Sequence, residues 1–259
     1  MKINEKGMKK LLGILLALLT LTARVSASDE ARIFAEGNKA YNEKDFGKAI
    51  KLYESLMEAG WTSPDLEYNL GNAWYRHGSV GRAVLHYERA LLCNPHHGEA
   101  KKNLAFLASK IASDMEPLPE FFLAKWWKIA RTAFTATTMG VVGLAGWWLG
   151  CMALGAWLLN KAQFQKKWML TAGISLMVAS LLPISLSLSR SFYEQNTQQA
   201  ILIQKSAILR AAPDETSSEV LTLDEGMKLE QVTHLEGWWQ VRLPNGEVGW
   251  LPEQAMERI

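Results

Sequence analysis

The sequence predicts a multi-domain chain with three parts: an all-α array of helical repeats, a two-helix transmembrane hairpin and a small all-β barrel. Three observations lead to this fold class. A glycine motif recurs at a step of 34 residues, from Gly37 to Gly71. Two long apolar runs without charged side chains follow it. Residues 200–259 then break into short alternating segments separated by glycine and proline turns, which is typical of strands.

The first 27 residues have the pattern of a secretory signal peptide. Several lysines precede an apolar run from Leu11 to Leu21, and Val25 and Ala27 provide a small-residue cleavage site. The run of eleven residues is too short to cross a bilayer, which needs about 20. We therefore expect cleavage after Ala27, and the alternative is an uncleaved anchor.

Residues 28–115 are expected to hold two helical repeats and a capping helix. Equivalent residues recur at the 34-residue step: Gly37 and Gly71, Asn38 and Asn72, Phe46 and Val80, Ala49 and Ala83, and Tyr53 and Tyr87. This spacing resembles the tetratricopeptide repeat family, whose stacked helix pairs form a concave surface that grips peptides. About three repeats are usually needed for stability. Self-association or the membrane-proximal segment could therefore supply additional support.

The resemblance implies a set of protein-binding residues on the concave face. In the family, two positions of each first helix face that side, and here asparagines occupy them: Asn38, Asn69, Asn72 and Asn103. Three more side chains lie one turn further on the same face: Tyr41, Tyr75 and Arg76. An amide both donates and accepts hydrogen bonds, so it can hold an extended peptide backbone. Replacing Asn38 and Asn72 is expected to weaken partner capture with little effect on thermal unfolding, unless asparagine is simply common at these positions.

Residues 133–159 and 168–189 each form an apolar run long enough to cross about 30 Å of hydrocarbon as a helix. They predict a transmembrane hairpin, and the alternative is one buried helical domain. Gly146 and Gly150 form a step in the first run that lets helices pack closely. Packing against the second run is the simpler interpretation, and dimerisation is the other.

Three shorter segments connect these parts. Residues 116–132 mix aromatic and basic side chains, which suits an interfacial linker, and residues 190–199 are expected to be a second linker. The loop at residues 160–167 carries three lysines and no acid, which favours the cytoplasmic side. We therefore expect a two-pass protein of the inner (cytoplasmic) membrane, with both soluble parts on the periplasmic or extracytoplasmic side.

Residues 200–259 are expected to form an SH3-like barrel. The strings 209–213 and 237–252 resemble the bacterial SH3 family. That resemblance implies that Trp238 and Pro252 are the tryptophan and proline of a ligand groove, although plain packing is an equal alternative for Trp238. The tyrosine that follows this proline in related domains is replaced by Ala255, which leaves the aromatic floor for a proline-rich ligand incomplete.

Charge and chemistry exclude several classes of function. The chain has 28 Lys and Arg against 26 Asp and Glu, and residues 200–259 have five against ten, which argues against nucleic acid or anionic lipid as the barrel's ligand. The two cysteines, Cys93 and Cys151, lie too far apart in the predicted topology for a disulfide framework. No catalytic constellation, metal-ligand spacing or phosphate loop is evident. We therefore expect a non-enzymatic protein without cofactors.

The order of the parts resembles the BatE family of the Bacteroidetes aerotolerance (Bat) operon. This resemblance rests on architecture and length. It implies a periplasmic scaffold whose partners are membrane proteins with von Willebrand factor A domains. The alternative is an envelope module that binds peptidoglycan through its SH3-like domain. Self-association is also left open.

Overall fold

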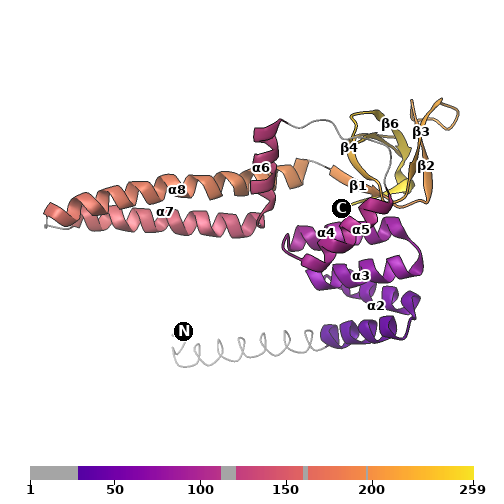
Figure 1. Ribbon diagram of the computed structural model, residues 1–259, viewed down its shortest axis with the longest axis horizontal. Coiled ribbons are helices and arrows are strands. Elements are labelled where there is room, and N and C mark those ends of the chain that lie inside the picture. Colours follow the sequence, from indigo (N-terminus) through magenta and orange to yellow (C-terminus); the bar gives the residue numbers. More distant parts are fainter. Residues whose placement is uncertain (1–28, 112–120, 160–162, 197) are drawn as a thin grey trace, which may run out of the picture.

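The computed structural model describes residues 29–111, 121–159, 163–196 and 198–259. It contains a helical domain, a helical hairpin and a barrel (Figure 1). The predicted signal peptide lies outside the described residues, as do residues 112–115 of the predicted repeat region, residues 116–120 of the predicted interfacial linker and residues 160–162 of the predicted loop. A helical region followed by an antiparallel sheet confirms the predicted order of the parts.

The helical domain, residues 29–111, is a stack of neighbouring helices. A helix over residues 29–42 is followed by α2 (Phe46–Glu58), α3 (Pro64–His77), α4 (Val80–Cys93) and α5 (Gly98–Lys110). Local signals set the boundaries. Asp45 and Ser63 accept backbone hydrogen bonds at the starts of α2 and α3, and Gly78 ends α3 with a φ of 97°.

The 34-residue period is also a period of packing. A Cβ added to Gly37 would lie 2.5 Å from the ring of Tyr53, and one added to Gly71 would lie 2.7 Å from the ring of Tyr87. Both tyrosines are buried, each at 1% exposure. Glycine at these positions therefore lets a buried aromatic ring approach the preceding helix, once in each helix pair.

The hairpin consists of α7 (Ala136–Leu159) and α8 (Gln163–Asn196), with α6 (Phe122–Thr132) lying across its base (Figure 1). Both long helices are apolar enough to cross a membrane, and only 11% of the most apolar window of each is buried. The helices pack on each other through glycines. A Cβ on Gly143 or Gly150 would lie 2.5 Å from Ile184 or Met177 of α8, and Gly146 faces Ser180 of the same helix. These contacts favour packing within the chain over dimerisation.

The connecting segments are more helical than the sequence suggested. Residues 190–199, expected as a linker, are helical up to Asn196, and strand β1 begins at Gln198. Residues 116–132, expected as an interfacial linker, contain the whole of α6. Arg190 on α8 is 5% exposed, and its side chain donates to the backbone oxygens of Phe134 and, at 3.4 Å, Leu92. The hairpin thus contacts the helical domain directly.

The barrel is built from short antiparallel strands in the order β3-β2-β6-β5-β4-β1-β7. Their bounds are β1 (Gln198–Leu202), β2 (Ser206–Arg210), β3 (Glu219–Asp224), β4 (Lys228–Leu235), β5 (Trp238–Arg242), β6 (Val248–Pro252) and β7 (Met256–Arg258). Gly226, Gly237 and Gly246 have positive φ in turns of the barrel, and Gly246 lies in the turn between β5 and β6. Val241 is buried in the core and Trp239 packs against it.

The barrel docks on the helical domain, mainly through β1 against α4. Ile201 of β1 is fully buried in one apolar cluster with Leu85 and Ala100 of the helices. Ion pairs surround this contact: Lys228 lies 2.9 Å from Glu88, and Arg89 lies 3.1 Å from Glu257. The barrel therefore covers part of the second helix pair, a support that was expected from self-association or the membrane-proximal segment.

Candidate protein-binding surface

The four predicted asparagines form two equivalent hydrogen-bonded pairs. Asn38 Oδ1 accepts from the Tyr53 hydroxyl at 2.7 Å and from Asn69 Nδ2 at 3.0 Å. In the next helix pair, Asn72 Oδ1 accepts from the Tyr87 hydroxyl at 2.7 Å and from Asn103 Nδ2 at 2.9 Å. Asn38 and Asn72 thus each connect the hydroxyl of a buried tyrosine to an asparagine of the helix that follows.

These bonds change what the asparagines can do. The carbonyl oxygens of Asn38 and Asn72 are used within the domain, whereas their Nδ2 donors have no partner among the described residues. A hollow of about 360 Å³ opens beside them, lined by Asn38, Tyr41, Asn42, Tyr53, Asn69 and Asn72. The side chains can donate to a peptide carbonyl. Their replacement by alanine would also leave the tyrosine hydroxyls without acceptors, so the expectation of little effect on unfolding is corrected here.

The tyrosines remain neutral donors over the physiological pH range. Burial raises the pKa of Tyr53 to about 12, and it raises the pKa of Tyr87 even further. Burial also raises the pKa of Tyr41 against the opposing effect of Arg76. The hydroxyl protons that hold the asparagine oxygens are therefore retained.

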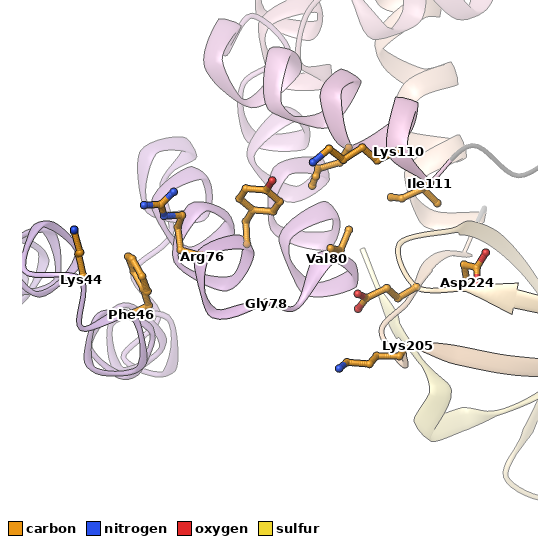
Figure 2. Close-up of a pocket in the computed structure, with 12 residues that line it drawn as sticks. Lys44, Phe46, Arg76, Gly78, Val80, Lys110, Ile111, Lys205 and Asp224 are labelled. Atoms are coloured by element: carbon orange, nitrogen blue, oxygen red, sulfur yellow. The ribbon is translucent and has the colours of Figure 1, made fainter.

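A second hollow, the interdomain groove, opens between the helical domain and the barrel (Figure 2). Its volume is about 870 Å³, and its lining includes Lys44, Phe46, Tyr75, Arg76, Lys110 and Lys205. Two of the predicted binding residues, Tyr75 and Arg76, line this groove, whereas Tyr41 and three of the four asparagines line the smaller hollow. The structure therefore distributes the predicted repeat residues over two adjoining surfaces.

Aromatic rings support two of the groove cations. The Arg76 guanidinium lies 5.5 Å from the centre of the Phe46 ring, and Lys110 Nζ lies 4.4 Å from that of Phe106. The Phe106 ring in turn meets Tyr75 edge-on at 6.4 Å. This packing holds the charged groups at the groove wall.

Lys44, Lys110 and Lys205 were not among the site residues predicted from the sequence. Lys110 lies 34 residues after Arg76, so extending the period by one more step would have found it. Lys205 has no such signal, because it joins the groove only through the docking of the barrel.

The two predicted barrel residues lie next to each other, apart from both hollows. Trp238 and Pro252 are direct partners across strands β5 and β6, and both are half-buried. Neither lines the interdomain groove or the asparagine hollow. Ala255 is fully buried in the barrel core, so this position cannot contribute an aromatic surface beside Pro252.

The comparison with protein families identifies the barrel. Residues 204–256 match the family described as the bacterial SH3 domain. The match begins after β1, so the strand that docks on α4 lies outside it. Domains of this family often bind cell wall or protein. The chain therefore carries a C-terminal bacterial SH3 domain behind a helical N-terminal region.

Proposed function

We propose that this chain is a non-enzymatic, membrane-anchored scaffold that binds protein partners outside the cytoplasm. One observation carries the proposal: the helical domain and the SH3 domain lie on opposite sides of the hairpin in sequence and pack on each other in space. Parts in contact share one compartment. This contact supports a hairpin that returns to the side from which it starts, as two membrane crossings do.

Protein binding is supported by the helical domain. Its equivalent glycine–tyrosine contacts and asparagine pairs recur at the 34-residue step, as expected for tetratricopeptide repeats. Repeats of this kind present concave surfaces to peptides. The amide donors and the interdomain groove are the features of this chain that suit such a ligand.

The compartment is tested by reporter fusions. The predicted signal peptide and the lysine-rich loop favour a periplasmic location for both soluble parts. Fusions made after Asp114 and after Ile259 should both behave as exported. A cytoplasmic signal from either fusion would contradict the proposed topology.

The partner is tested by cross-linking in intact membranes followed by purification of the tagged full-length chain. The resemblance to the BatE family makes membrane proteins with von Willebrand factor A domains the expected partners. We expect such proteins, or other extracytoplasmic membrane proteins, to be recovered in a constant ratio to the tagged chain. Recovery of no protein above an untagged control would contradict a scaffold function.

Peptidoglycan is the alternative ligand, favoured by the bacterial SH3 match and by the paired Trp238 and Pro252. Co-sedimentation with purified sacculi separates the two functions. Tight sedimentation that is lost in Trp238→Ala, together with no cross-linked protein partner, would favour the wall-binding function. A scaffold predicts weak sedimentation that this substitution leaves unchanged.

A further inference from the structure

We propose that the interdomain groove binds an extended, acidic segment of a partner protein, with the helical domain and the SH3 domain contributing to one site. The proposal rests on the protein-binding function above and adds the chemistry of the ligand and the place where it binds. Figure 2 shows the groove, with side chains from both domains around it.

Charge is the first argument. Residues 29–111 contain eleven Lys and Arg and eleven Asp and Glu, so the helical domain is neutral overall, and the SH3 domain is acidic. The groove nevertheless gathers four exposed cations: Lys44, Arg76, Lys110 and Lys205. Positive charge is therefore concentrated at this surface against the charge of the domains that form it. A concave surface with one excess sign of charge attracts ligands of the opposite sign.

The state of these cations is the second argument. Within the described residues, none of the four forms an ion pair with a carboxylate. Arg76 and Lys110 rest instead on aromatic rings, which orient a cation without neutralising its charge. Two acids also line the groove, but Glu225 already accepts a hydrogen bond from the backbone nitrogen of Gly81, at 3.3 Å. Asp224 is the other carboxylate in the groove lining, so the four cations outnumber the acids there.

The neighbouring asparagines point to a polypeptide rather than a small anion. Asn72 precedes Arg76 by four residues on α3, so the two side chains share one face of that helix. The Nδ2 donor of Asn72 has no partner among the described residues. A chain crossing this face can place a backbone carbonyl on the amide and acidic side chains near the cations. Tyr75 and Phe46 provide apolar surface between them.

The test uses the full-length protein in detergent micelles and three fluorescein-labelled peptides of equal length. One alternates glutamate with alanine, and in the others glutamine or lysine replaces glutamate. We expect anisotropy to report binding of the glutamate peptide that weakens as salt is raised. The glutamine and lysine peptides should bind several-fold more weakly. Equal binding of the glutamine peptide would overturn the charge argument.

Charge-neutralising variants locate the site. R76Q, K110Q and K205Q should each weaken binding of the glutamate peptide by about twofold to fivefold, as expected for exposed charge pairs. K102Q is the matched control, because Lys102 is an exposed lysine of α5 that does not line the groove. An unchanged affinity in K205Q would overturn the shared site, because this lysine alone comes from the SH3 domain.

Further outcomes separate this inference from the proposed function. If the glutamate peptide does not bind while cross-linking still recovers partner proteins, the groove assignment fails and the scaffold function remains. In another outcome, polyphosphate displaces the glutamate peptide while the groove variants bind both polyphosphate and the peptide as the wild type does. That result would place the site outside the groove and would also overturn the inference.

Discussion

Gly47 and Gly81 occupy the same position in the two helix pairs, 34 residues apart, but have different surroundings. Among the described residues, a Cβ on Gly47 would meet only the His77 ring, at 4.0 Å. One on Gly81 would lie 2.4 Å from the carbonyl oxygen of Leu202 in strand β1 of the barrel. The first helix pair is open at this point, and the second is covered by another domain. The 34-residue period therefore describes the contacts within each helix pair. Whether a position has room for a larger side chain depends on the domain that packs against that pair.

The starts of the two equivalent helices differ in the same way. Asp45 accepts a hydrogen bond from the Lys48 backbone nitrogen at the start of α2. Ser79, at the corresponding position of α4, makes no side-chain cap, and Glu225 of the SH3 domain accepts from Gly81 instead. At this helix start, the SH3 domain thus supplies the hydrogen-bond acceptor for the second helix pair, whereas the first pair supplies its own.

Alanine substitution of the two glycines should have opposite effects. Gly81→Ala forces a methyl group against backbone atoms and should cost about 1–3 kcal/mol, as overpacking does. Gly47→Ala has free space and removes a flexible residue from a helix, so it should stabilise by up to about 1 kcal/mol. Thermal unfolding in micelles, followed by tryptophan fluorescence, measures both. Equal shifts in the two variants would contradict the docked arrangement.

Removing the tyrosine hydroxyls should show a smaller difference between the helix pairs. Tyr53→Phe breaks one hydrogen bond, to Asn38, and should cost about 1 kcal/mol. Tyr87→Phe breaks the bond to Asn72 and also loses the contact with Asn103 Nδ2 at 3.2 Å, so its cost should be larger. Chemical denaturation of the two variants ranks them. A greater loss in Tyr53→Phe would contradict the hydrogen bonds described above.

The smallest effect is expected at the helix start that the SH3 domain covers. Glu225→Gln keeps an acceptor oxygen but removes a negative charge from the N-terminus of α4, which should cost about 0.3–1 kcal/mol. Hydrogen exchange should rise in the first turn of α4 and at β1, while α2 is unchanged. Uniform exchange across both helix pairs would show that the carboxylate has no local role.

The parts of the fold that depend on local patterns could be predicted from the sequence. The SH3 barrel and the two apolar helices both follow from short strings of residues. The docking of the barrel could not be predicted from the sequence. Ile201 has the pattern of an ordinary strand residue, and only the structure shows that it packs in the apolar cluster of α4. The interdomain groove shares this limit, since Lys205 and Arg76 are far apart in sequence and meet only through that contact.

Partner capture by the two glycine variants tests most directly whether the soluble parts act as one binding body. The full-length variants would be cross-linked in intact membranes after hydrogen exchange has shown that the SH3 domain is loosened in Gly81→Ala and docked in Gly47→Ala. We predict that Gly47→Ala recovers partner proteins as the wild type does and that Gly81→Ala recovers several-fold less. Full recovery by a demonstrably loosened Gly81→Ala would contradict a scaffold that binds through the joined domains.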